Sequence, residues 1–234
     1  MAKFTKAVFF DVDFTLIHPG PTFRGEGYRA FCERHGIVVD ESAFDAAVES
    51  ASPLLNGPDD APYDAGIFVA YTRHIIEQMG GRGPSLDACA REIYTEWAGC
   101  HHFELYDDVA RVLGDLAARG VRMGLISNSH RCLVSFQSHF ELVGLISAVV
   151  SSAEHGFMKP HPSIFAAALQ QVDVPAGEAV MVGDSVRQDV DGALRAGMRA
   201  VLLHRGAGDH AEISTLRARG IPVISSLDEL AAHL

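Results

Sequence analysis

Four short segments of this chain place phosphate-handling or metal-binding groups where apolar runs end. In chain order they supply two carboxylates, then a hydroxyl and an amide, then an ammonium, and finally two further carboxylates. This set of groups suits phosphoryl transfer through an aspartate assisted by a magnesium ion. The segments are Phe9–Thr15, Leu125–Asn128, Met158–Pro160, and Val182–Asp184 with the nearby Asp189.

Asp11 and Asp13 stand two residues apart, directly after the first apolar run. In extended backbone, residues two apart project from the same face, so the two carboxylates can act together. One can stay ionised as a nucleophile while the other carries a proton as acid and base. Alone, the pattern also fits a turn with solvated acids, so its weight comes from the other segments.

Each of the other segments has an ordinary alternative explanation. Ser127 and Asn128 can bind phosphate oxygens or cap a helix. Lys159 can be a surface lysine, and Asp184 and Asp189 can favour a helix dipole. Gathering several acids is unfavourable, because two unit charges at 4 Å repel by about 4 kcal/mol at an effective dielectric of 20.

Positive charge would offset the repulsion between the clustered acids. Mg²⁺ prefers hard oxygen ligands, which Asp11, Asp184 and a backbone carbonyl supply. Lys159 adds an ammonium. The four segments together therefore favour a phosphoryl-transfer site over four unrelated surface features.

The elements that must hold these residues alternate between strands and helices. Nearly continuous apolar runs predict strands buried on both faces of a parallel sheet, and helical periodicity fills the stretches between them. The fold class is therefore α/β, with a doubly wound, mainly parallel sheet and a Rossmann-like core. The expected strands are Lys6–Phe10, Val121–Ile126, Ser147–Val150, Ala179–Val182 and Ala200–Leu203; the expected helices are 107–119, 163–171 and 186–196.

One region interrupts this alternation. From His18 to about Cys100 there is no buried strand pattern, only helical stripes separated by joints rich in Pro and Gly. We therefore expect a helical cap at 18–100, inserted into an α/β core made of 1–17 and 101–234.

Composition limits the partners. The 234 residues carry a formal net charge of −11, which disfavours nucleic acid and anionic membranes. The first apolar run is too short for a signal peptide, and no run approaches the ~18 residues of a membrane span. The four cysteines show no metal or disulfide spacing. We expect a cytoplasmic protein with reduced thiols, and the sequence leaves its oligomeric state open.

The motif residues resemble those of the haloacid dehalogenase superfamily, in order and in spacing. The matching stretches are Phe10–Leu16, Ser127-Asn128, Lys159-Pro160 and Gly183–Asp189. The resemblance covers most of the chain, and the helical insertion is similar to the small cap that many members carry after the first motif.

The resemblance implies a role for each residue of the first two motifs. Asp11 would attack phosphorus and become an aspartyl-phosphate. Asp13 would protonate the leaving oxygen and then activate the hydrolytic water. Thr15 would orient the first loop, and Ser127 with Asn128 would bind the phosphate.

It also implies roles for the last two motifs. Lys159 would neutralise developing charge. Asp184 would ligate Mg²⁺ together with Asp11 and the backbone carbonyl of Asp13, and Asp189 would support the metal. Because members that cleave carbon–halogen bonds lack an acid at the position of Asp13, its presence favours phosphate chemistry.

The expected activity is Mg²⁺-dependent hydrolysis of a small phosphorylated metabolite. A phosphotransferase such as a sugar phosphomutase could use the same residues, and a non-catalytic binding protein of this fold is a further alternative. The identity of the substrate does not follow from the sequence.

Several residues outside these assignments could also have a role in binding or in metal coordination. Phe14 occupies a place that is often glycine in the family, and we expect ordinary backbone there, with the side chain facing the cap. Cys100-His101-His102 is expected to be a surface or hinge segment rather than a metal site. His130, His155 and His161 fall near the site, where one could contact the substrate, but a structural or exposed role is expected for each. Gly206-Ala207-Gly208 is expected to be a loop.

Overall fold

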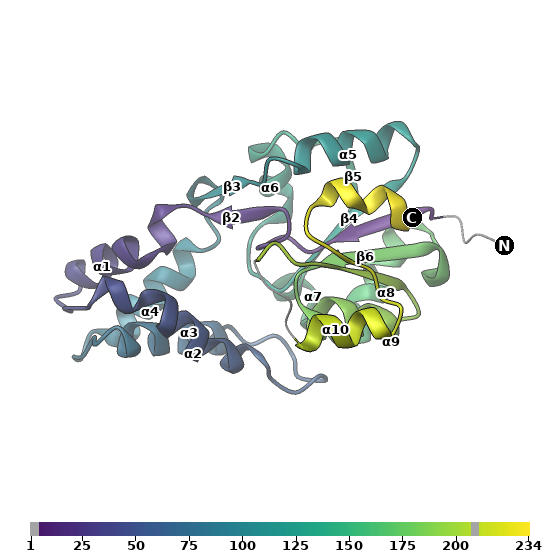
Figure 1. Ribbon diagram of the computed structural model, residues 1–234. Helices are drawn as coiled ribbons and strands as arrows, with labels where there is room; N and C mark the ends of the chain where they lie inside the picture. Colours follow the sequence, from purple (N-terminus) through teal and green to yellow (C-terminus); the bar gives the residue numbers. More distant parts are fainter. Residues whose placement is uncertain (1–4, 207–210) are drawn as a thin grey trace. The chain divides into compact units, whose positions relative to one another are not determined.

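The chain forms two compact units in this computed structural model, which describes residues 5–206 and 211–234 (Figure 1). One unit joins the chain up to His18 with Leu105–Leu234, and the other comprises Pro19–Glu104. Residues 207–210 of the loop expected after Gly206 lie outside the described part.

A parallel sheet forms the centre of the first unit. Within the described residues it has six strands in the order β5-β4-β1-β6-β7-β8. The predicted doubly wound α/β sheet is confirmed. The strands are β1 Ala7–Phe10, β4 Arg122–Ser127, β5 Ile146–Ser151, β6 Ala179–Gly183, β7 Arg199–Leu203 and β8 Val223–Ile224.

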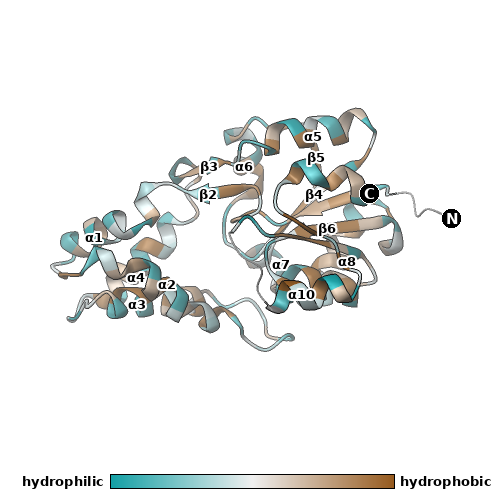
Figure 2. Ribbon diagram, in the orientation of Figure 1, coloured by the Kyte–Doolittle hydropathy of each residue, from teal (hydrophilic) through white to brown (hydrophobic). Residues whose placement is uncertain are grey.

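Helices cover both faces of this sheet (Figure 1). The face with Phe9 and Met181 packs against Ile164 and Phe165 in one hydrophobic cluster. Burial on both sides explains why most positions in these strands are apolar, as the largely brown colour of β4 and β6 in Figure 2 shows. The elements are α5 Val109–Ala118, α6 Leu133–His139, α7 Ser152–His155, α8 Pro162–Val172, η5 Ala176–Glu178, the π-helical turn η6 Val186–Asp191, α9 Gly192–Arg195, α10 Ala211–Ala218 and η7 Leu227–His233.

The second unit is built from helices around an aromatic centre. Phe23 packs against Trp97 with ring centroids 4.6 Å apart and against Phe103 at 5.4 Å. The short strands β2 (Ile17–Pro19) and β3 (Phe103–Leu105) pair where the chain leaves and rejoins the first unit. The helices are η1 Pro21–Phe23, α1 Gly25–Arg34, η2 Glu41–Ala43, α2 Phe44–Ala51, η3 Ser52–Leu55, α3 Ala65–Gln78, α4 Leu86–Glu96 and η4 Cys100–His102.

All four cysteines lie in the described part of the chain and are free thiols. None of the described helices has the length and apolar character needed to cross a membrane.

Candidate active site

The carboxyl ends of three adjacent strands bring the sequence motifs together. Asp11 follows β1, Ser127 ends β4 and Asp184 follows β6. Phe10 of β1 is level with Leu125 on one side and with Val182 on the other. Because the strands are parallel, their carboxyl ends meet at one edge, where ligands bind in open α/β sheets.

Lys159 lies at the centre of the charged cluster and is fully buried. Its Nζ atom donates to Asp11 Oδ1 at 2.5 Å and to Asp189 Oδ1 at 2.7 Å. Burial alone would lower the pKa of Lys159, but the two carboxylates outweigh it and raise that pKa. The lysine is therefore a permanent cation held between two acids.

The acids around Lys159 still repel one another. Asp11, Asp184 and Asp189 each offer an oxygen, and these oxygens lie within 4.8 Å of one another. Burial raises the pKa of Asp11 to about 7, with Asp189 adding to the shift and Lys159 opposing it. Desolvation together with Asp11 and Asp189 raises the pKa of Asp184 well above its ordinary value.

These shifts are those of a carboxylate cluster with too little positive charge. A hard divalent cation among the three oxygens would relieve the repulsion, and an oxygen-only donor set suits Mg²⁺. The residues present therefore fit the metal that the resemblance implies.

Asp189 owes its position to the π-helical turn η6 and to Gly183. The N–H of Ser185 donates to Asp189 Oδ2 at 3.0 Å. A Cβ atom at Gly183 would lie only 2.2 Å from the Asp189 carboxyl group. Glycine at the end of β6 is therefore what lets the Asp189 side chain approach the strand and reach Lys159.

Asn128 holds the backbone of Lys159. Its Oδ1 accepts from the Lys159 N–H at 2.6 Å, and its Nδ2 donates to the Lys159 carbonyl at 2.9 Å and to Gln188 Oε1 at 3.1 Å. The predicted role of Asn128 in binding phosphate stays a prediction, and the structure adds this clamp.

The two hydroxyl groups of the motifs have different partners. Ser127 Oγ bonds to Ser129 Oγ at 2.9 Å, and both residues are buried. Thr15 Oγ1 donates to Asp11 Oδ2 at 3.4 Å.

Arg131 is a site residue that the motifs did not point to. Its side chain is 0% exposed, and its Nη2 donates to Asp13 Oδ1 at 2.9 Å. The available signal was the unbroken run of small and polar residues from Ser127 to Cys132 after a buried strand. The structure thus places a buried guanidinium on the second carboxylate of the first motif.

The expectation of ordinary backbone at Phe14 is wrong. Phe14 has φ 63°, in the left-handed region, and its N–H donates to the Ile17 carbonyl at 2.7 Å. The tight loop after β1, which also bonds Leu16 N–H to the Val12 carbonyl, fixes this conformation. The strain that a bulky residue suffers there is therefore present.

Two of the histidines near the motifs, His155 and His161, bond to the same serine. His155 Nε2 and His161 Nδ1 each lie 2.7 Å from Ser163 Oγ. In the second unit, ligand atoms of Glu96, His101 and His102 lie within 4.8 Å of one another. Glu96 bonds His102 Nε2 at 3.0 Å, a convergence that the adjacent histidines alone did not indicate.

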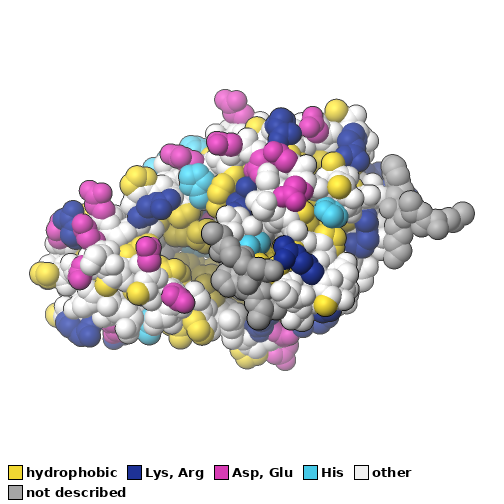
Figure 3. Space-filling view, viewed as in Figure 1, with side chains coloured by type: hydrophobic (Ala, Val, Ile, Leu, Met, Phe, Trp, Pro, Cys, Tyr) yellow, Lys and Arg dark blue, Asp and Glu magenta, His cyan; other side chains and the backbone are white. Residues whose placement is uncertain are grey.

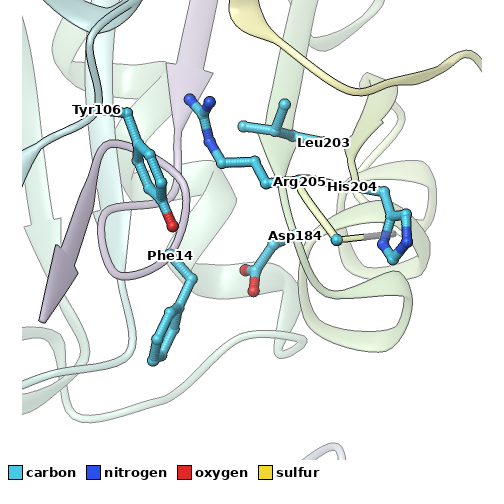
Figure 4. Close-up of a pocket in the computed structure, with 7 residues that line it drawn as sticks. Phe14, Tyr106, Asp184, Leu203, His204 and Arg205 are labelled. Atoms are coloured by element: carbon cyan, nitrogen blue, oxygen red, sulfur yellow. The ribbon is translucent and has the colours of Figure 1, made fainter. Parts of the chain in front are cut away.

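An open pocket lies beside Asp184, with a volume of about 340 Å³ (Figure 4). Its described lining residues belong to the first unit, and they come from the loop after β1, the start of the segment before α5, and the ends of β6 and β7. They are Phe14, Tyr106, Asp184, Leu203, His204, Arg205 and Gly206.

This fold and this site define a hydrolase with a parallel α/β sheet and a cluster of acids around a buried lysine at the carboxyl edge of its strands. The family model of the haloacid dehalogenase-like hydrolases matches residues 5–197, and the chain belongs to that family. The predicted family and the predicted enzyme class, a hydrolase, are confirmed.

Individual relatives match this chain over nearly its full length and over nearly all of their own. A haloacid dehalogenase-like hydrolase domain-containing protein 3 from Danio rerio is 30% identical, covering 97% of this chain and 95% of its own. An N-acylneuraminate-9-phosphatase from Homo sapiens is 30% identical, covering 98% and 93%. The solved structure of a HAD phosphatase from Thermococcus onnurineus shares the fold, with TM-score 0.63, 24% identity, and 97% and 96% covered.

Proposed function

We propose that this chain is a Mg²⁺-dependent phosphatase that hydrolyses a small phosphate monoester through an aspartyl-phosphate on Asp11. One observation carries the proposal: buried Lys159 bridges Asp11 and Asp189 beside Asp184 at the carboxyl edge of the sheet. Relatives with phosphatase names, including a glyceraldehyde 3-phosphate phosphatase from Methanothermobacter thermautotrophicus at 28% identity, support the substrate class.

In the first half-reaction, an oxygen of Asp11 forms a bond to phosphorus as the bond from phosphorus to the leaving oxygen breaks. Asp13 gives its proton to that oxygen, and the alcohol departs. In the second, Asp13 takes a proton from water, whose oxygen bonds to phosphorus as the bond to Asp11 breaks. Inorganic phosphate leaves, and both aspartates return to their starting states.

The remaining motif residues bind and neutralise the phosphoryl group. Ser127 and the backbone N–H of Asn128 offer donors to its oxygens, Thr15 orients the first loop, and Lys159 stabilises the charge that develops on the phosphoryl oxygens. Arg131 donates to Asp13 Oδ1 at 2.9 Å and holds the carboxyl group in place, which leaves Oδ2 to carry the proton.

Asp11, Asp184 and the backbone carbonyl of Asp13 would hold Mg²⁺, with Asp189 in support. When bound, the ion supplies positive charge to the phosphoryl oxygens and to the crowded carboxylates. We assign this chemistry to the core, 1–17 and 101–234, and substrate enclosure to the cap, 18–100.

Asp11→Asn tests the nucleophile. The amide cannot form the acyl-phosphate, so release of inorganic phosphate from a phosphate monoester should fall by about 10³-fold or more. Removal of Mg²⁺ with EDTA should abolish turnover, and added Mg²⁺ should restore it. Asp115→Asn is the matched control, because that carboxylate is 70% exposed and lies in α5.

Retained turnover in Asp11→Asn, with Asp115→Asn unchanged, contradicts the assignment of the nucleophile. Rearranged ester without free phosphate in the wild-type reaction contradicts hydrolysis and indicates phosphoryl transfer to a second acceptor.

A further inference from the structure

Phe14 keeps a conformation that glycine would adopt without strain. Its φ of 63° is fixed by the hydrogen bonds of the tight loop after β1. Bulky residues rarely stand in this region, and strained residues of this kind cluster at functional sites. A phenylalanine at this position therefore calls for an explanation that backbone stability does not provide.

The side chain of Phe14 supplies one. It is 46% exposed, among the few large apolar side chains that reach the surface of the described chain. It lines the pocket that also contains Asp184 and Tyr106, and Figure 4 shows its ring projecting beside the Asp184 carboxylate. Because an Asp184 oxygen lies within 4.8 Å of an Asp11 oxygen, a group attached to phosphate at Asp11 can extend into this pocket.

Among its described lining residues the pocket has two aromatic side chains, Phe14 and Tyr106, one imidazole, His204, and no lysine. Arg205 is their one guanidinium, and it donates to both Asp108 oxygens at 2.9 and 2.8 Å. It also donates to the Thr15 carbonyl at 3.1 Å and lies 3.9 Å from the centre of the Tyr106 ring. The proposed Mg²⁺ at Asp184 would already be shared between the carboxylates and the transferred phosphoryl group, so a second anion on the substrate would bring further negative charge beside Asp184, which is unfavourable.

We propose that this pocket receives the leaving group of the substrate and that Phe14 selects a neutral leaving group with a flat apolar face. The ring of an aryl alcohol or of a sugar has such a face and packs on an aromatic ring. Esters whose leaving group carries a carboxylate or a second phosphate are disfavoured. This inference rests on the proposed phosphatase function and adds the substrate class.

Three phosphate esters of alkyl alcohols test the preference in the wild-type protein with Mg²⁺. The leaving group of benzyl phosphate is neutral and has a ring, that of glycerol 1-phosphate is neutral without a ring, and that of 3-phosphoglycerate carries a carboxylate. The expected order of kcat/KM is benzyl phosphate first and 3-phosphoglycerate last.

Variants of Phe14 separate the ring from the backbone. Phe14→Gly should lower the ratio of kcat/KM for benzyl phosphate over glycerol 1-phosphate by about tenfold, since it removes a ring contact. Phe14→Tyr keeps the ring and should keep the ratio. Phe14→Ala lacks the ring but keeps the strained backbone, so its melting temperature should be lower than that of Phe14→Gly.

Glu141→Gly is the matched control. Glu141 is exposed, has φ 57°, and is not among the pocket residues, so glycine there relieves similar strain without touching the proposed binding wall. It should leave the substrate ratio unchanged. An unchanged ratio in Phe14→Gly, an equal loss on all three esters, or a wild-type preference for 3-phosphoglycerate would each overturn the inference. Failure of the proposed function would appear separately, as turnover by Asp11→Asn.

Discussion

Gly183 matters for the side chain that it lacks. A Cβ atom there would stand 2.2 Å from the carboxyl group of Asp189, which is buried and bonded to Lys159 and to the Ser185 N–H. Gly183→Ala should therefore displace Asp189, lower the free energy of unfolding by about 1–3 kcal/mol, and reduce kcat/KM. Urea denaturation and phosphate release measure the two effects.

Gly114→Ala provides the contrast. Gly114 lies within α5, and a Cβ atom there meets nothing within 4 Å. Alanine should raise the free energy of unfolding by about 0.5–1 kcal/mol, because glycine is a poor helix former, with activity unchanged. Equal stability changes in the two variants would mean that close contact at Gly183 is not what sets its identity.

Individual residues differ in how far the sequence reveals them. Asp11 and Asp184 could be placed together, because each directly follows an apolar run and parallel strands align their carboxyl ends. The backbone conformation of Phe14 could not be predicted from the sequence, since the hydrogen bonds that fix it in the left-handed region form only in the folded loop. Arg131 was missed because an arginine in a polar segment is usually exposed, and only the fold buries it against Asp13.

At the scale of elements, continuous apolar runs were sufficient to predict five strands of the sheet. β8 was missed because two residues, Val223 and Ile224, carry no periodicity. The segment 186–196 was predicted as one helix, whereas it begins as the π-helical turn η6 and continues as α9. The wider turn depends on hydrogen bonds that sequence periodicity does not encode.

The Arg205–Asp108 pair ties several elements of the first unit together. Asp108, at the start of α5, accepts from Arg205 after β7, from Ser226 Oγ at 2.8 Å and from the Leu227 N–H at 2.9 Å. Arg205 also reaches the Thr15 carbonyl in the loop after β1. The pair therefore supports the loop after β1 through the Thr15 carbonyl.

Asp108→Asn tests this support through pH. Burial acts to raise the pKa of Asp108, but the bonds from Arg205, Leu227 and Ser226 outweigh it and lower that pKa. A carboxyl with a lowered folded-state pKa stabilises the fold above its unfolded pKa of about 3.9 and loses that effect as the pH falls further. Asp108→Asn should cost about 2–3 kcal/mol of unfolding free energy at neutral pH.

The measurement is urea denaturation of both proteins across the acidic range. The difference between wild type and Asp108→Asn should stay constant down to about pH 4 and shrink below it. Asp115→Asn, at an exposed ion pair, should show little difference at any pH. A wild-type advantage that persists unchanged in acid would contradict a stabilising role of the ionised carboxylate.

At the scale of the whole molecule, charge opposes the proposed chemistry. The chain carries a formal net charge of −11, and acidic side chains are spread over the visible surface of each unit (Figure 3). A phosphate ester dianion approaching from solvent meets this negative field first. Lys159 and Arg131 are buried, so their charge acts at short range beside the acids that they contact.

Screening of this field should speed substrate capture. The Debye length falls from about 30 Å at 0.01 M salt to about 8 Å at 0.15 M, so long-range repulsion weakens while contacts within the site persist. With Mg²⁺ held constant, kcat/KM for a phosphate monoester should rise about twofold over this range of NaCl.

The variant with Glu49→Lys and Glu212→Lys, both at exposed positions, moves the net charge from −11 to −7, because each change adds two charges. It should show a higher kcat/KM at low salt and a flatter dependence on NaCl. A kcat/KM that falls as salt is added to the wild type would show instead that the positive charge of the site, and not the acidic surface, governs the approach of the substrate.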